Sequence, residues 1–95
     1  MAEKYISYNL SVLITKQGKS FVAYSPVLDL STVGKTEMKA KKMFVEAVSL
    51  FFEELIERNT LNEVLVDLGW QKVKKVWNPP KVSNVPMQIR VPALV

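Results

Sequence analysis

Residues 21–40, FVAYSPVLDLSTVGKTEMKA, decide the fold of this chain. A β-rich run ends at a proline, a second apolar run follows, and Gly34-Lys35-Thr36 precedes a helix start. A phosphate-binding loop of the form GxxxxGK[ST] would need a glycine five positions before Gly34, where the chain has Asp29. We therefore interpret Gly34 as the turn out of the sheet and Thr36 as the cap of the helix.

Three extended segments are predicted before or within that stretch. Residues 6–15 alternate apolar and polar side chains except at Leu13, which is typical of a half-buried strand, with the apolar set Ile6, Tyr8, Leu10, Val12 and Ile14. Residues 16–19 form a polar turn with a glycine, and residues 20–24 resume a β-rich run, so the pair predicts a hairpin. Pro26 ends the second strand because it offers no ladder donor, and residues 27–33 form a third.

Two helices are predicted to follow in series. The first runs over residues 37–58 and covers the sheet with a stripe that recurs every three or four positions: Ala40, Phe44, Ala47, Val48, Phe51 and Leu55. The second begins with a capping box, in which Thr60 and Glu63 satisfy each other's backbone donors, and ends at Gly69.

The C-terminal quarter is predicted to be an arm rather than a second domain. Residues 71–77 favour a fourth strand, residues 78–81 a stiff extended spacer, and Met87, Ile89 and Val91 a short edge strand between prolines. The predicted fold class is α+β, with a three-stranded antiparallel sheet packed by one long helix and a short second helix. Residues 1–70 form its core, and residues 71–95 form a basic, proline-containing arm without a separate DNA-binding domain.

The composition argues against catalysis. The 95 residues include no cysteine and no histidine, which removes thiolate chemistry, imidazole acid-base catalysis and the usual zinc ligands. Asp29 is the only carboxylate expected on a strand, and one carboxylate does not hold a catalytic metal. We predict no catalytic, cofactor-binding or metal-ligating residues. The chain also lacks a visible signal peptide and an apolar run of the ~20 residues that span a bilayer, so we expect a soluble, cytoplasmic protein.

The long helix carries a second apolar stripe that cannot face the same sheet. Its members are Met38, Val45, Phe52 and Ile56, roughly 100° around the helix from the first stripe. We expect the second helix to cover Phe52 and Ile56. Met38 and Val45 then need another cover, which predicts a homodimer, a higher oligomer or a partner protein at an interface that includes Met38, Val45 and Phe52.

Two roles compete for the arm. Its alternating residues Met87, Ile89 and Val91 would add a strand to a neighbouring subunit or to a partner protein. Alternatively, its cations would contact nucleic-acid phosphates, since five of the thirteen Lys and Arg residues, and none of the nine acids, follow residue 70: Lys72, Lys74, Lys75, Lys81 and Arg90. Trp70 and Trp77 lie among these cations and could stack on bases, but a place in the core is the favoured interpretation of both.

Several short motifs follow one another in an order that is itself informative. They are a first strand over residues 8–15, FVAYSPVL at 21–28, STVGKT at 31–36, Ala40, Glu46-Ala47 and Leu68-Gly69-Trp70. In this order and spacing they resemble the HicB-like antitoxin family, over about residues 5–70. Gly34 and Thr36 coincide with the G-x-T of that family.

The resemblance implies a partial ribonuclease H-like fold without nuclease activity. It also implies an antitoxin of a type II toxin-antitoxin pair, which binds a HicA-type mRNA interferase and masks its catalytic surface. Lys39 departs from the Glu that the family often has, and the four prolines of residues 71–95 exclude the terminal DNA-binding helices of many members. Three hypotheses therefore stand beside one another: a protein-binding antitoxin, a small nucleic-acid-binding protein that uses the basic arm, and an enzyme on a ribonuclease H-like sheet.

Overall fold

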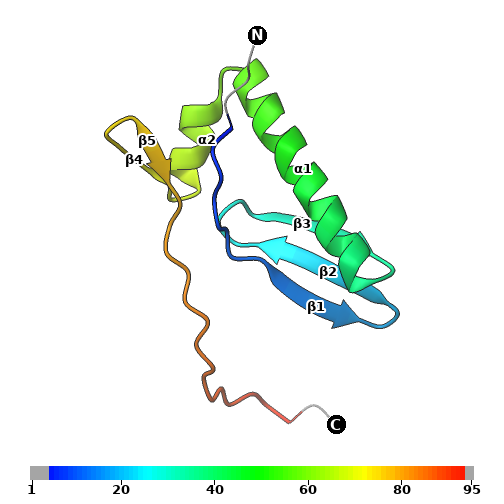
Figure 1. Ribbon diagram of the computed structural model, residues 1–95. Coiled ribbons are helices and arrows are strands. Elements are labelled where there is room, and N and C mark those ends of the chain that lie inside the picture. The colour runs from blue at the N-terminus through cyan, green and yellow to red at the C-terminus, as the bar shows by residue number, and fades with distance from the viewer. Residues whose placement is uncertain (1–4, 94–95) are drawn as a thin grey trace.

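The chain folds as a three-stranded sheet, two helices and a small two-stranded hairpin, and the computed structural model describes residues 5–93. The elements in chain order are β1 (Leu13–Gln17), β2 (Ser20–Ser25), β3 (Leu30–Gly34), α1 (Glu37–Glu57), α2 (Leu61–Asp67), β4 (Gln71–Val73) and β5 (Val76–Asn78). The first three strands form an antiparallel sheet in the order β1-β2-β3, and β4 pairs with β5 in a separate sheet. α1 lies across one face of the larger sheet. α2 follows the C-terminal end of α1, and the small β4–β5 hairpin lies next to α2 (Figure 1). The predicted α+β class is confirmed.

The first strand is shorter than predicted. β1 begins at Leu13, whereas the alternation suggested a start near residue 6. Leu13 pairs with Tyr24, close to the end of β2, so two positions earlier the partner would be Pro26. Proline has no N–H for the ladder, and the pairing therefore stops where β2 stops.

The third strand also begins later than predicted. Residues 26–29 form a turn, and Leu30 is the first residue of β3. Asp29 has a φ of 49°, a left-handed conformation that Asp tolerates better than most residues. Val27 and Leu28 are therefore not strand residues, but both are buried in the core.

α1 has the cap, the length and the buried face that the sequence predicts. The Thr36 hydroxyl accepts a hydrogen bond from the Lys39 N–H at 3.1 Å, which confirms the N-cap. The predicted stripe is buried or half-buried along its whole length: Ala40, Phe44, Ala47, Val48, Phe51 and Leu55.

Gly34 is required at the start of α1 for a different reason from the predicted sharp turn. Its φ does not lie in the left-handed region where Gly18 and Gly69 lie. A Cβ at position 34 would instead stand 2.5 Å from the backbone nitrogen of Ala40, so only glycine lets α1 approach β3 this closely. The hydroxyl of Thr32 on β3 donates to the Ala40 carbonyl at 2.9 Å and ties the two elements together.

The end of α2 follows the prediction. Gly69 has a φ of 92°, and the N–H of Trp70 donates to the Leu65 carbonyl at 2.9 Å. The Gly69 N–H donates to the Val66 carbonyl at 3.0 Å, which completes a Schellman closure.

The predicted capping box between the helices is wrong. Thr60 precedes α2, but its side chain makes no capping hydrogen bond. Asn59 has a φ of 60° and closes α1 in the same way as a C-terminal glycine, so the Thr60 N–H already donates to the Leu55 carbonyl at 2.9 Å. That donor is thus not available to Glu63.

Residues 71–78 form a hairpin rather than the single predicted strand. Val73 pairs with Val76, so Lys74 and Lys75 form a two-residue loop. Their φ values of 51° and 68° are those of a type I′ turn, which usually contains Asn-Gly. The lysines gave no turn signal in the sequence.

The larger core cluster joins residues from distant parts of the chain. It contains the buried side chains of Val27, Leu28, Leu65 and Trp70, and the Trp70 indole N–H donates to the Val27 carbonyl at 2.7 Å. Tyr8 packs edge-on against Trp70, with ring centroids 5.4 Å apart. The favoured core placement of Trp70 is confirmed.

The predicted arm of residues 71–95 is divided into the β4–β5 hairpin and an extended segment, residues 79–93, to which the word arm refers from here on. Residues 79–93 include no helix or strand, so the predicted edge strand at Met87, Ile89 and Val91 is absent from the described chain. Its first residues still touch the body, since Pro80 lies beside Gly69. From residue 81 to residue 93 every side chain is exposed, and the arm extends away from the sheet (Figure 1). Among residues 5–93 no helix is long and apolar enough to cross a membrane.

Candidate interaction surfaces

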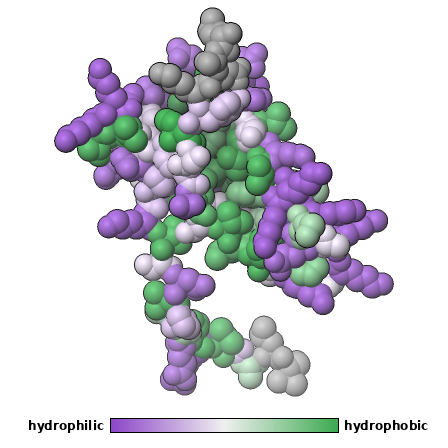
Figure 2. All heavy atoms as spheres, viewed as in Figure 1, coloured by the Kyte–Doolittle hydropathy of each residue, from purple (hydrophilic) through white to green (hydrophobic). Residues whose placement is uncertain are grey.

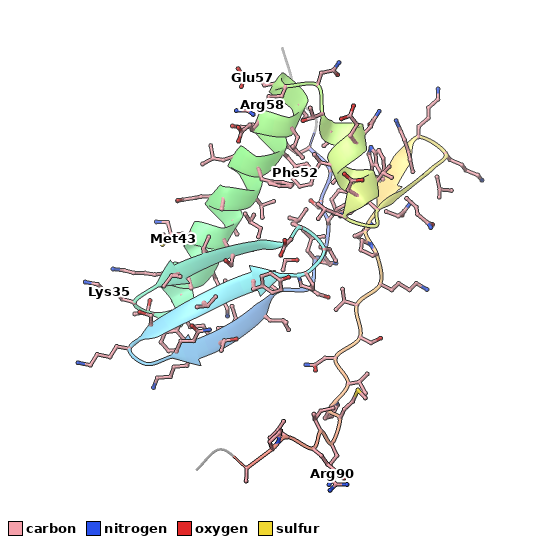
Figure 3. The ribbon with its side chains drawn as sticks, turned by 180° about the vertical axis from the view of Figure 1, so that it is seen from behind. Lys35, Met43, Phe52, Glu57, Arg58 and Arg90 are labelled. Carbon is pink, nitrogen blue, oxygen red and sulfur yellow. The ribbon has the colours of Figure 1, made fainter. Side chains whose placement is uncertain are left out.

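The second stripe of α1 is only partly covered. Met38 is 80% exposed and Val45 is 66% exposed, as expected for residues with no cover in their own chain. Phe52 is half-buried between α1 and α2, with its ring centroid 6.2 Å from that of Trp70 (Figure 3). Ile56 was expected under α2 and is 63% exposed, because α2 is only seven residues long and packs on Phe52 instead. The exposed stripe is therefore Met38, Val45 and Ile56.

The charges of α1 are divided between its two ends. Lys39, Lys41 and Lys42 lie in its first two turns, and Glu53, Glu54 and Glu57 lie in its last two. The helix dipole favours acids at the N-terminus and bases at the C-terminus, so most of this arrangement does not stabilise the isolated helix. Lys35 and Glu57 mark the basic and acidic ends in Figure 3.

Two ion pairs within the helix leave other charges without a partner. Lys41 pairs with Glu37 at 2.8 Å, and Arg58 pairs with Glu54 at 2.9 Å. Within residues 5–93 neither Lys42 nor Glu53 is in an ion pair. Both are exposed and available to a partner.

The face of the sheet turned away from α1 is a surface that the sequence reasoning missed. Ala23 and Ser25 face the helix and are buried, so the alternating Val22 and Tyr24 face outward. Val22 is paired with Val33, which is exposed on the same side. The alternation of the strands indicated which side chains share this face. Their exposure could not be predicted, because it depends on the sheet being covered by a helix on one side only.

Tyr24 on this outer face is coupled to the turn before β3. Its hydroxyl donates to Asp29 Oδ1 at 3.1 Å. This hydrogen bond, with smaller contributions from desolvation and from the negative charge of Asp29, raises the pKa of the Tyr24 phenol above its usual value. Asp29 thus has a structural partner, and residues 5–93 contain no group of three or more metal-ligating side chains.

The predicted nucleic-acid contacts are distributed over two segments. Lys72, Lys74 and Lys75 lie on the β4–β5 hairpin, whereas Lys81 and Arg90 lie on the arm, and all five are exposed. The ammonium of Lys72 lies 5.6 Å above the half-buried ring of Trp77. Trp70 is buried and therefore cannot stack on a base. Lys72 covers one face of Trp77, so a base could not stack on that face of the ring.

The arm presents the apolar residues that the sequence singled out. Met87, Ile89 and Val91 are all largely exposed, and Val85 continues the same alternation toward the body. Hydrophobic side chains stand clear of the body along this segment (Figure 2). The five residues between Pro86 and Pro92 all retain their N–H groups, so this part of the arm could pair along one strand edge.

The predicted site residues therefore form three separate surfaces rather than one pocket: the exposed stripe of α1, the basic hairpin and the arm. Comparison of the chain with family models, curated proteins and solved structures gave no match.

Proposed function

We propose that this protein is a HicB-like antitoxin that neutralises a HicA-type mRNA interferase by protein-protein contact. The order of three antiparallel strands followed by a long helix agrees with the partial ribonuclease H-like fold that the resemblance implies. The G-x-T segment also has a defined role, because Gly34 admits the helix and Thr36 caps it.

The exposed arm is the observation that supports a binding role most directly. An extended segment with exposed apolar residues at alternate positions is typical of a binding segment, because burial against another surface would remove its apolar side chains from water. Strand addition would satisfy both its backbone groups and its side chains. In this proposal Met87, Ile89 and Val91 bind the toxin, and the prolines lower the entropy lost when the arm becomes ordered.

Co-expression with a candidate toxin tests this proposal. The candidate is a small basic protein with a glycine-histidine motif, encoded in a neighbouring reading frame. We expect co-purification of the two proteins and loss of the toxin's mRNA cleavage. A chain truncated after Lys81 should fold normally, because every described residue beyond it is exposed, yet bind the toxin at least tenfold more weakly.

A matched variant separates strand addition from charge attraction. Replacing Lys72, Lys74 and Lys75 by Gln leaves the arm intact and should change toxin binding little at physiological salt, where exposed charges are screened over about 8 Å. A truncated chain that still binds and inhibits the toxin would contradict the role of the arm.

The same proposal includes the absence of nuclease activity. Single-stranded RNA, structured RNA and RNA–DNA hybrids should remain intact with Mg²⁺ or Mn²⁺ present. Cleavage that follows the protein through purification and disappears in Asp29→Asn would overturn this part of the proposal.

Nucleic-acid binding is the second candidate function, and the β4–β5 hairpin favours it. Three lysines lie on this hairpin, and two of them form its tip with left-handed φ values. If all five cations contact phosphates, the logarithm of the affinity should fall with the logarithm of salt concentration with a slope of about −4.5 for duplex DNA. A much smaller slope, or no binding at low salt, would exclude this use of the hairpin and arm.

A further inference from the structure

The exposed stripe belongs to a longer seam with an unusual internal symmetry. The seam comprises positions 38, 42, 45, 49, 52 and 56 of α1, separated alternately by four and three residues. This is the spacing of side chains that line the contact between two packed helices. Each position has a counterpart at the same distance on the other side of residue 47, so the seam has the same spacing in both directions.

Two of the three symmetric pairs of the seam are complementary in chemistry, and the third places a cation near an acid. Met38 corresponds to Ile56, and both are apolar and mostly exposed. Val45 corresponds to Ser49, a small residue that permits close approach of two helices. Lys42 corresponds to Phe52, which is half-buried against the core of its own chain, and the next residue is the exposed Glu53.

We propose that two copies of this protein form a dimer through antiparallel α1 helices, related by a two-fold axis level with Ala47. Met38 then packs against Ile56 of the partner subunit, and Val45 packs against Ser49 of the partner subunit. The two-fold axis brings Glu53 of the partner subunit to within about 1.5 Å of Lys42 along the helix axis, and both residues lie on the same flank of the seam. The ammonium of Lys42 therefore lies beside Glu53 of the partner subunit.

Charge complementarity identifies the occupant of this surface as a second copy. An antiparallel arrangement places the basic end of each α1 against the acidic end of the other, whereas a parallel one would place like charges together. It gives Lys42 and Glu53 the partners that they lack within one chain. It also gives a role to a charge order that the helix dipole does not favour. Two equivalent sets of contacts arise because the same patch is used twice.

The dimer is independent of the antitoxin function, since it uses α1 rather than the arm. The contact is confined to one helix from each subunit, so we expect a small interface with a dissociation constant of roughly 1–100 µM.

A matched pair of substitutions tests which side of α1 is used. Val45 and Leu50 are both 66% exposed, but only Val45 lies in the seam. Sedimentation equilibrium of the full-length protein should show a dimer for the wild type and for Leu50→Glu. Val45→Glu should weaken the dimer about 100-fold or more, because each dimer would bury two carboxylates without a partner. Circular dichroism should show both variants folded.

Cysteine cross-linking tests the direction of the helices, since the natural chain contains no cysteine. In an antiparallel dimer Met38→Cys and Ile56→Cys should form a disulfide with each other when the two proteins are mixed. Either variant alone should not cross-link, because residue 38 and its copy would be about 27 Å apart along the axis. Efficient cross-linking of Met38→Cys with itself would show a parallel pair and overturn the proposal.

Charge exchange gives a third and independent result. Lys42→Glu and Glu53→Lys should each weaken the dimer, and the double variant should recover most of the wild-type affinity. A wild-type chain that remains monomeric at about 500 µM, well above the expected dissociation constant, would contradict the dimer itself.

Discussion

The two apolar stripes of α1 differ in location rather than in chemistry. Ala40 and Phe44 face the sheet and are buried, whereas Met38 and Val45, a few positions away, are mostly exposed. Both stripes recur at helical spacing, and both contain large hydrophobic side chains. The helix therefore has one face that holds the protein together and another whose burial requires a second molecule.

The difference shows why apolar periodicity alone does not define a core. A helix of 21 residues that lies on three strands can cover only one side of itself with that sheet. The second stripe would be covered by α2 if α2 were longer, but α2 reaches Phe52 and leaves Ile56 exposed. Substitutions on the two stripes should accordingly have different effects, which gives the predictions below.

The largest effect is expected on the sheet-facing stripe. Phe44→Ala should lower the free energy of unfolding by about 3–5 kcal/mol, because it removes a buried ring and leaves a cavity between α1 and the sheet. Denaturant titration with circular dichroism measures this change. A loss below about 1 kcal/mol would mean that this face is not the main core contact of the helix.

The next effect comes from the distance between α1 and β3. Gly34→Ala should cost about 3 kcal/mol, since the new methyl group would meet the Ala40 backbone nitrogen at 2.5 Å and neither backbone can move easily. Gly18→Ala is the control for turn geometry, because nothing lies within 4 Å of its Cβ position. A loss below about 1 kcal/mol for Gly34→Ala would show that α1 can move away from β3 and that close packing does not decide the need for Gly34.

The elements that could be predicted from sequence are those fixed by local chemistry. Thr36 begins α1 and Gly69 ends α2 because each satisfies backbone groups near its own position. The helix itself was also predicted correctly, since its apolar residues recur at a helical period that local spacing is enough to reveal. These features do not depend on which distant residue lies opposite.

The errors arose where a distant partner decides the outcome. The alternation over residues 6–15 was real, but the strand starts at Leu13 because Pro26 ends the partner's ladder. The capping box at Thr60 failed because Asn59 closes α1 first and the Thr60 N–H is already used. In both cases the residue that decides the outcome lies outside the motif on which the prediction was based.

The candidate sites also divide into features that the sequence predicts and features that depend on the rest of the fold. Exposure of Met38 and Val45 followed from counting the faces of one helix, and it was correct. The type I′ turn at Lys74 and Lys75 gave no signal, since these residues are not the ones that usually adopt left-handed φ values. The outer face of the sheet was missed because its exposure depends on the number of layers, which the sequence does not state.

A smaller effect is expected at the start of α1, where the Thr36 side chain caps the helix. Thr36→Ala should reduce the free energy of unfolding by about 1 kcal/mol, because the Lys39 N–H loses its acceptor. Thr36→Ser keeps the hydroxyl and should stay within about 0.5 kcal/mol of the wild type. Similar losses in both variants would indicate that the methyl group, and not the cap, is the stabilising part of Thr36.

The smallest effect on the monomer is expected at Val45, and Val48 gives a matched comparison on the same helix. Val48 is half-buried against the core, so Val48→Ala should cost about 1–2 kcal/mol at any protein concentration. Val45→Ala should change the stability of the dilute monomer by no more than about 0.5 kcal/mol, because its side chain is mostly exposed.

At concentrations above the dimer dissociation constant, the wild type should gain stability through mass action, and Val45→Ala should gain less. Thermal unfolding from about 5 to 500 µM, a range spanning the expected dissociation constant, measures both effects. If the midpoint of the wild type does not rise over this range, or if Val45→Ala is as destabilising as Val48→Ala when dilute, the exposed stripe is part of the monomer's own stability and not an interface.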